Sequence, residues 1–196
     1  MGSEPAIIDE GVETEEPERH LLNVDEFLAL DEAGFFEPLG TVELVEGEIF
    51  VLSPLYIPHG RVTLELAVTI KLALREAGSD LIVASPVSAM MNDRSLPQPD
   101  IVVGRDLGGK WMTPEAARLF VEVSQSTLSH DLRRKAALYA RTGVPEYWVA
   151  DVKGRRIVRL HGPEGDAYAI RQEFAFGEAV PSATIPGLVV DTSALP

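Results

Sequence analysis

The sequence predicts a mixed β-sheet flanked by helices, in the α/β or α+β class. Short runs rich in β-branched residues occur along most of the chain. Two segments, 60–77 and 130–142, instead show the three-to-four spacing of apolar residues that is typical of helices. Some of the β-rich runs are joined by tight turns and others alternate with helices, which indicates a mixed sheet. The 196 residues favour one domain over residues 20–196.

The N-terminal third contains a tail, a helix and a hairpin. Residues 1–19 are rich in Glu and Pro with little periodicity, which predicts a disordered acidic tail. An apolar stripe predicts a short helix over 21–33. T-V-E-L-V (41–45) and E-I-F-V-L (48–52) are separated by a Glu-Gly pair, which predicts a hairpin. After a Pro-rich loop, the helix over 60–77 ends at a glycine.

The rest of the chain alternates between β-rich runs and one further helix. We expect this helix over 130–142, with Ser129 as its cap and with Gly143 and Pro145 ending it. Residues 92–98 and 105–118 are expected as loops, the latter with one helical turn after Pro114. Beyond the last run we expect short β segments between Pro and Gly residues. The expected strands are 81–84, 87–91, 100–103, 119–124, 146–151 and 156–160.

Composition excludes several kinds of site. The chain has no cysteine, which excludes disulfides, thiolate nucleophiles and zinc sites built on cysteine. No apolar run reaches the roughly 18 residues that a membrane span needs. The N-terminus is acidic and lacks the apolar segment of a signal peptide. We therefore expect a cytoplasmic location.

The net charge of −14 is unusual for a protein that contacts nucleic acid. Residues 1–32 hold 11 of the 31 acidic residues and only one basic residue, Arg19. The remaining 16 basic and 20 acidic residues give −4. Since phosphate contacts supply most nonspecific affinity for DNA, this balance argues against tight nonspecific binding. It leaves room for a weak or metal-dependent encounter.

Two carboxylates occur in apolar strand contexts. Glu122 lies in the middle of L-F-V-E-V, a run that reads as a buried strand, so its charge must be paired, protonated or bound to a metal. Asp100 follows Pro99 at the start of another apolar run. A Pro-Asp pair alone is common in turns, and a strand-end salt bridge is the plain alternative for Glu122. Together, the two carboxylates offer the oxygen ligands that Mg²⁺ prefers.

Three further residues have both a functional and a plain interpretation. Lys135 on the predicted helix either points back at the carboxylates or forms an ordinary surface pair with Asp131, four residues earlier. Glu43 is either part of the site or an exposed glutamate in a hairpin strand. His59 lies between a Pro-rich loop and a helix, where a cap or core histidine is the commoner outcome.

An ordered set of motifs then covers most of the chain. In order, they are E-L-V-E-G-E-I with S-P and His59 after it, P-D-I-V-V, V-E-V-S, and D-L-R-R-K-A-A-L-Y-A-R-T-G-V-P-E-Y-W-V-A-D. This set resembles the Uma-two (DUF820-like) family of restriction endonucleases, which is similar in fold to the PD-(D/E)XK nuclease superfamily. The resemblance runs from about residue 24 to about residue 192, and the stretch from Glu122 to Asp151 is its most specific part.

The resemblance implies a restriction endonuclease-like sheet and a role for each site residue. Asp100 and Glu122 would hold Mg²⁺ or Mn²⁺, and Glu43 would be an upstream acid that helps to hold metal or water. Lys135 would be the catalytic lysine, moved to the helix, because the superfamily's usual position holds Ser124 here. The implied reaction is metal-dependent hydrolysis of phosphodiester bonds in nucleic acid, taken as DNA. Cutting both strands of a duplex would imply a homodimer.

Other functions are weighed against this one. A catalytically silent binding or regulatory module is favoured by the acidic balance and by Ser124, and is opposed by the complete set of site residues. The chain has no G-x-S-x-G elbow, no phosphate loop around Gly108-Gly109-Lys110 and no H-E-x-x-H zinc helix. A group of basic residues either contacts phosphates or balances nearby acids: Arg133, Arg134, Arg141, Lys153, Arg155, Arg156 and Arg159. The histidines are scattered: His20, His59, His130 and His161.

Overall fold

The computed structural model describes residues 18–196 and contains the predicted mixed sheet flanked by helices. Its main sheet has six strands in the order β3-β4-β5-β6-β7-β8. Only β5 and β6 run parallel, and every other neighbouring pair is antiparallel. The predicted tail at 1–19 lies almost entirely outside the described residues. The strands are β3 (Ile82–Ala84), β4 (Ile101–Gly104), β5 (Ala117–Ser124), β6 (Glu146–Asp151), β7 (Arg156–Glu164) and β8 (Ala167–Ala175).

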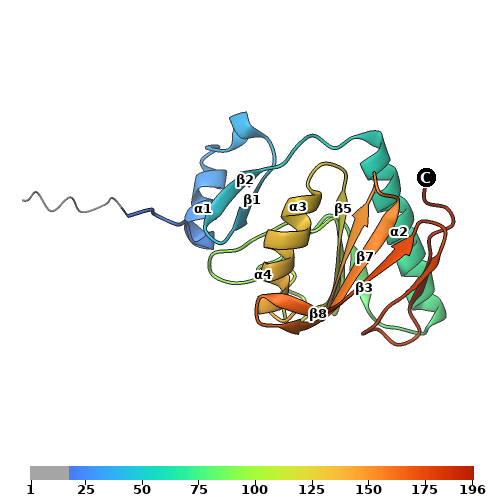
Figure 1. Ribbon diagram of the computed structural model, residues 1–196. Coiled ribbons are helices and arrows are strands. Elements are labelled where there is room, and N and C mark those ends of the chain that lie inside the picture. The colour runs from blue at the N-terminus through green and yellow to red at the C-terminus, as the bar shows by residue number, and fades with distance from the viewer. Residues whose placement is uncertain (1–17) are drawn as a thin grey trace, which may run out of the picture.

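Helices cover both faces of this sheet (Figure 1). On one face lies α2 (Ile57–Glu76). On the other lies one continuous helical segment, in which α3 (Leu128–His130) leads into a π-helical turn, η2 (Asp131–Lys135), and then α4 (Ala136–Arg141). A π turn widens the helix and is frequent at functional sites. The helix predicted at 130–142 is therefore present, with a distorted turn that ends at Lys135. It begins at Leu128, so Ser129 lies inside the helix and the prediction that it is the cap is wrong.

The two faces explain why β5 reads as an apolar run. Leu119, Val121 and Val123 belong to the core packed against α2. Phe120 belongs to the core packed against α4. Side chains alternate along a strand, so Glu122 points to the same face as Phe120. This alternation directs its carboxylate toward the π turn.

The N-terminal elements form a separate layer beside the main sheet. Helix α1 (Val24–Glu32) begins at Asn23 with a capping box, and its Phe27 stacks on Phe36, the residue before a short 3₁₀ turn, η1 (Glu37–Leu39). The predicted hairpin consists of β1 (Val42–Val45) and β2 (Glu48–Val51). Its turn residues have φ angles of 55° at Glu46 and 80° at Gly47, the positive values that two-residue hairpins favour.

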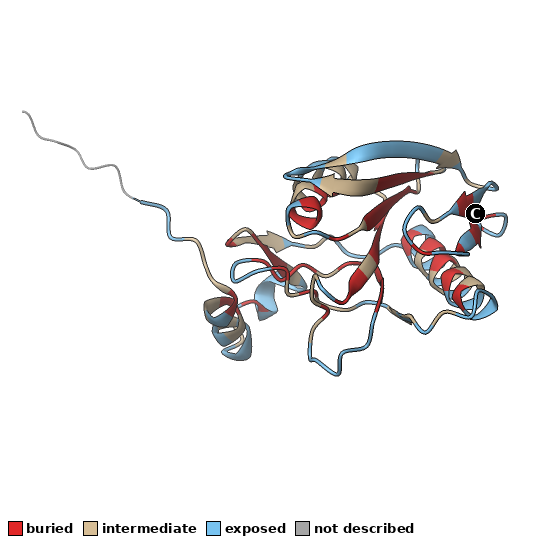
Figure 2. Cartoon of the chain, turned by 90° about the horizontal axis from the view of Figure 1, so that it is seen from below, coloured by how far each residue is buried: buried red, intermediate tan, exposed pale blue. Residues whose placement is uncertain are grey.

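The C-terminal residues complete the core on the α2 face. Strands β9 (Ala179–Pro181) and β10 (Val189–Asp191) form a small hairpin, and its residues Val180 and Val190 are buried with α2. Figure 2 shows buried strands in the middle of the main sheet and an exposed strand at its edge. That edge strand is β8, which is largely exposed. The predicted C-terminal β segments are confirmed.

Two local predictions differ from the structure. Residues 87–91 form no strand, because a single bridge from Ala89 to Met112 and loop hydrogen bonds hold this segment. Helix α2 begins at Ile57 rather than at residue 60, because Pro58 lies in the first turn, where a missing N–H costs nothing.

Within residues 18–196, no helix combines the length and apolar character that crossing a membrane requires.

Candidate active site

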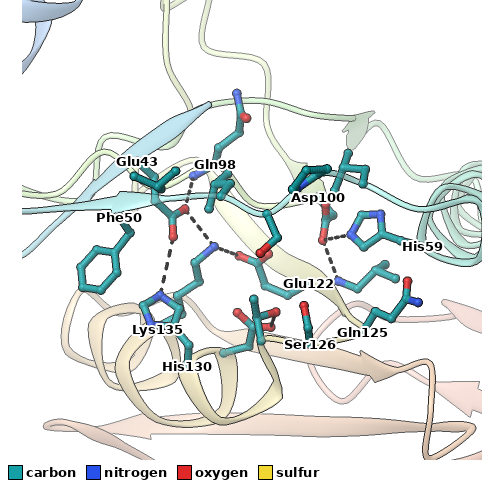
Figure 3. Close-up of a pocket in the computed structure, with 18 of the residues that line it drawn as sticks. Glu43, Phe50, His59, Gln98, Asp100, Glu122, Gln125, Ser126, His130 and Lys135 are labelled. Carbon is teal, nitrogen blue, oxygen red and sulfur yellow. Dashed lines mark hydrogen bonds and ion pairs between the residues drawn. The ribbon is translucent and has the colours of Figure 1, made fainter. Parts of the chain in front are cut away.

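A pocket of about 170 Å³ lies where β1, the start of α2, the ends of β4 and β5, and the π turn meet. Figure 3 shows its polar side chains pointing toward one another. Glu43, Asp100, Glu122 and Lys135 all line it. The four residues singled out in the sequence are therefore brought together from three strand segments and one helix.

Lys135 lies at the centre of this group. Its Nζ is 2.9 Å from Glu43 Oε2 and 3.0 Å from Glu122 Oε1 (Figure 3). The side chain is only 5% exposed, so the interpretation as a surface pair with Asp131 is wrong. Burial alone would lower the pKa of Lys135, but the charges of Glu122 and Glu43 raise it on balance. The lysine is therefore a fixed cation between two carboxylates.

Glu43 is buried in β1, so the interpretation as an exposed strand glutamate is wrong. Its Oε2 accepts hydrogen bonds from Lys135 and, at 3.3 Å, from the backbone N–H of Gln98. Its Oε1 lies 3.6 Å from His130 Nε2 and has no hydrogen-bond partner among the described residues. Burial would raise the pKa of Glu43, but His130 and Lys135 lower it on balance. One buried oxygen of Glu43 thus faces His130 without a hydrogen bond in the described chain.

At Glu122, the effect of burial on the pKa outweighs that of the neighbouring positive charge. Its Oε1 accepts from Lys135 and, at 3.1 Å, from the hydroxyl of Tyr139. Burial raises the pKa of Glu122 well above its ordinary value, and although Lys135 opposes this, the neighbouring carboxylates add to it. One ammonium therefore does not compensate for the charge and burial around Glu122.

Asp100 is held at the rim of β4 by contacts from two other elements. Its Oδ2 accepts a 2.7 Å hydrogen bond from the backbone N–H of Val123 in β5. The same oxygen lies 3.3 Å from Nε2 of His59, which is near the start of α2. The contact with Asp100 raises the pKa of His59, although burial opposes it. His59 is thus placed at the site through Asp100.

The pocket holds more negative than positive charge. Asp131 is a fourth carboxylate in its wall, buried and accepting a 2.6 Å hydrogen bond from the hydroxyl of Thr127. Burial raises the pKa of Asp131. Four carboxylates and one ammonium give a formal charge of −3 when both histidines are neutral. An excess of this size in a buried site favours a bound cation.

The carboxylates suit a metal held by few protein ligands. Among residues 18–196, no group of three or more His, Asp or Glu side chains converges on one metal position. Lys135 occupies the space between Glu43 and Glu122, which explains this. In the described chain, protein donors contact only Oδ2 of Asp100 and Oε1 of Glu122. The second oxygens remain for a cation, and Mg²⁺ often takes one or two carboxylates, with water and substrate phosphate as its other ligands.

Most of the basic residues singled out in the sequence are engaged elsewhere. Arg134 pairs with Glu48, and Arg141 pairs with Glu46 at 2.7 Å. On β7, Arg156 pairs with Asp151 and Glu173, and Arg159 is largely buried. These contacts favour the interpretation that the basic residues balance nearby acids.

Three residues that line the pocket or contact its site residues were not assigned to the site from the sequence: His130, Asp131 and Tyr139. They belong to the helical segment after β5, and their positions relative to Lys135 depend on the π turn. Tyr139 follows Lys135 by four residues, which places both on one helix face. This spacing was the one signal in the sequence that would have found it.

Comparisons with known proteins agree with this geometry. The Uma2 family model, described as "Putative restriction endonuclease", matches residues 24–193. A search of curated proteins found no match. A solved structure titled as a putative nuclease belonging to DUF820 from Anabaena variabilis has a TM-score of 0.60 and 19% identity, and the match covers 82% of this chain and 89% of that chain. At this identity the likeness shows the fold alone, which is restriction endonuclease-like. The chain therefore belongs to the Uma2 family.

Proposed function

We propose that this protein is a metal-dependent endonuclease that hydrolyses phosphodiester bonds in nucleic acid, with DNA as its substrate. The observation that carries the proposal is the buried pocket with four carboxylates and one central ammonium. Membership of a family described as restriction endonucleases supports the same reaction class. The negative charge of the pocket favours a divalent cation, and phosphodiester hydrolysis commonly uses such cations.

Asp100 and Glu122 are the proposed ligands of Mg²⁺ or Mn²⁺. Each carboxylate has one oxygen fixed by protein donors, which orients the second oxygen. A divalent cation bound there supplies Lewis acidity, lowering the pKa of water and neutralising charge on the phosphate. Because burial raises the pKa of Glu122, the ligand is fully ionised only when the pH exceeds this raised value or when a cation is present.

Lys135 is proposed to stabilise negative charge on the phosphate. An ammonium has three N–H donors, and two of them point at Glu43 and Glu122. The third remains to donate to a phosphate oxygen or to a water. Glu43 is then a positioning residue, since it holds Lys135 on the side away from Glu122. Its second oxygen, without a hydrogen-bond partner in the described chain, is placed to accept from a water.

A catalytically silent binding module is the second candidate. The specific observation in its favour is that Lys135 is held by two carboxylates and that Ser124 stands where the superfamily has its lysine. Such a protein would still bind a divalent cation. Turnover therefore distinguishes the two candidates, and metal binding alone does not.

The test is cleavage of plasmid and linear DNA with Mg²⁺ or Mn²⁺, beside Asp100→Asn and Glu122→Gln. We expect cleavage only with metal, and a loss of about 100-fold or more in each variant. Asp106→Asn, in the loop after β4, is the matched control and should cut at the normal rate. Cleavage without metal, or full activity in both site variants, contradicts the assignment. Complete inactivity on DNA and RNA supports the silent module.

Two further predictions accompany this function. A homodimer would supply two active sites for cutting both strands, and light scattering of the purified protein measures its mass. A cytoplasmic location is testable by cell fractionation.

A further inference from the structure

The mouth of the pocket is unlike its interior. Residues 51–56, from the end of β2 to the start of α2, line one wall, and all of them except Ser53 are apolar or aromatic. Leu55 is 73% exposed and Tyr56 is 61% exposed, and Val51 is exposed as well. We call residues 51–56 the apolar rim. Exposed apolar side chains gathered beside a charged pocket indicate a binding surface.

Burial separates two parts of a nucleic-acid substrate. The charged side chains of the pocket, Glu43, Glu122 and Lys135, are buried, whereas Leu55 and Tyr56 at its mouth are exposed. A phosphate that reaches the charged interior therefore leaves the adjoining sugar and base at the mouth, against the apolar rim.

Charges near the mouth do not favour a paired duplex. Among residues 18–196, Lys135 is the one Lys or Arg side chain that lines the pocket, and it is buried between two carboxylates. On the same helical segment, Arg134 and Arg141 pair with Glu48 and Glu46, and Arg133 is exposed but does not line the pocket. Duplex binding draws most of its affinity from Lys and Arg contacts with phosphates. Affinity at this site must come from another source.

Stacking of a base on an exposed aromatic ring is such a source. Base–aromatic stacking adds affinity without a requirement for sequence, provided that the face of the base is free.

A polar group is also placed for the edge of the base. Gln125 lines the pocket on the side of His59 (Figure 3). Its Oε1 is buried without a hydrogen-bond partner among the described residues. An unsatisfied acceptor of this kind is rare in proteins and fits a donor on the ligand.

We propose that the apolar rim is a subsite for an unpaired nucleobase, in which the base stacks on Tyr56 and packs against Leu55. Gln125 accepts a hydrogen bond from the edge of that base. The substrate is therefore single-stranded DNA, or a strand with unpaired bases beside the scissile phosphate. This inference rests on the proposed endonuclease function and adds the substrate class to it.

The experiment compares three DNA substrates of one sequence: single-stranded, fully paired, and paired with one bulged base. With Mg²⁺ or Mn²⁺, we expect the single-stranded and bulged substrates to be cut about 10-fold or more faster than the duplex. Tyr56→Ala should raise KM by about 10-fold with little change in kcat, and Tyr56→Phe should restore it, because the ring alone stacks. Leu72→Ala is the matched control, since Leu72 is exposed on α2 outside the pocket.

A second readout does not depend on turnover. Fluorescence anisotropy with a labelled single strand in EDTA measures binding alone, and Tyr56→Ala should weaken it while Leu72→Ala should not. Equal cutting of duplex and single strand, with Tyr56→Ala like the wild type, overturns the subsite and leaves the nuclease intact. If no DNA is cut, the proposed function fails and anisotropy decides the subsite. A change of oligomeric mass in Tyr56→Ala, with binding unchanged, assigns the rim to a contact between copies of the chain and overturns the proposal.

Discussion

Two buried glutamates on neighbouring strands solve the same electrostatic problem in different ways. Glu122 in β5 and Glu146 in β6 both lie in apolar runs of the parallel strand pair. Glu146 accepts hydrogen bonds from neutral donors only: the indole N–H of Trp148 at 2.7 Å, and hydroxyl and backbone N–H groups of residues 182–184. Glu122 accepts from one hydroxyl and one ammonium.

The difference shows which carboxylate is structural. Both oxygens of Glu146 are saturated by protein donors, so nothing remains for a ligand. This network ties β6 to the loop after β9. Glu122 has one oxygen contacted and depends on the charge of Lys135, which it shares with Glu43. A buried carboxylate that is left incompletely satisfied is the one prepared for chemistry.

The largest effect is expected from removal of the shared cation. Lys135→Met leaves Glu43 and Glu122 buried without their common partner, which should lower the free energy of unfolding by about 3–5 kcal/mol near neutral pH. Cleavage should be lost as well. Chemical denaturation at several pH values measures the stability, and Lys71→Met, at an exposed position of α2, is the control.

The loss of stability in Lys135→Met should grow as the pH rises. In Lys135→Met the pKa of Glu122, which burial already raises, loses the opposing charge of Lys135 and rises further above the unfolded value of about 4.3, so the folded state binds more protons. The destabilisation should be small near pH 4 and should grow as the pH rises through the folded pKa. The same loss at pH 5 and pH 8 would show that packing, rather than charge, is the cause.

Glu146→Gln tests whether Glu146 serves the fold rather than the reaction. In the wild type, hydrogen-bond donors face both carboxylate oxygens of Glu146. The glutamine would replace one oxygen with an NH₂ group, which cannot accept from them, so we expect the free energy of unfolding to fall by about 2–3 kcal/mol. The melting temperature should fall by about 4–12 °C, while the cleavage rate per folded molecule stays unchanged. Glu164→Gln, at an exposed end of β7, is the matched control. A loss of cleavage without a loss of stability would make Glu146 part of the active site.

The sequence predicted the fold class and the central residues because their signals are local. Apolar runs and helical spacing predicted β4, β5, β6 and α2, and carboxylates inside such runs marked Asp100 and Glu122. The same local signal applies to Glu146, because E-Y-W-V-A-D is equally apolar. What separates Glu122 from Glu146 is the set of donors around each, and apart from Trp148 these donors come from segments more than ten residues away in the chain.

Other details also depended on contacts between distant segments. The burial of Glu43 requires β1 to pack beside residue 98 and the π turn, which no period-2 pattern encodes. The V-S-A-M-M run has strand propensity, but its backbone bonds to loops instead of joining the sheet. The π turn itself has no simple sequence signature, and it sets the direction in which Lys135 points.

The smallest expected effect comes from removing the hydroxyl of Tyr139, the one neutral donor to Glu122 among the described residues. Tyr139→Phe removes the hydroxyl that donates to Glu122 Oε1, and Tyr147→Phe removes a hydroxyl on the same sheet face that donates to the backbone carbonyl of Asp131. Both rings are fully buried, so the two variants should lose similar stability, about 1 kcal/mol each.

Only Tyr139→Phe should change the pH profile of cleavage. A hydrogen bond to the charged form of a carboxyl lowers its pKa, so its removal raises the pKa of Glu122 further above its ordinary value. In the proposed function, Glu122 must be ionised to hold the metal. The acidic limb of kcat/KM should therefore move to higher pH in Tyr139→Phe and stay in place in Tyr147→Phe, with less than about a tenfold change in rate at the alkaline plateau. Equal shifts in both variants would mean that the aromatic packing around β5, and not the donor to Glu122, controls the ionisation of the site.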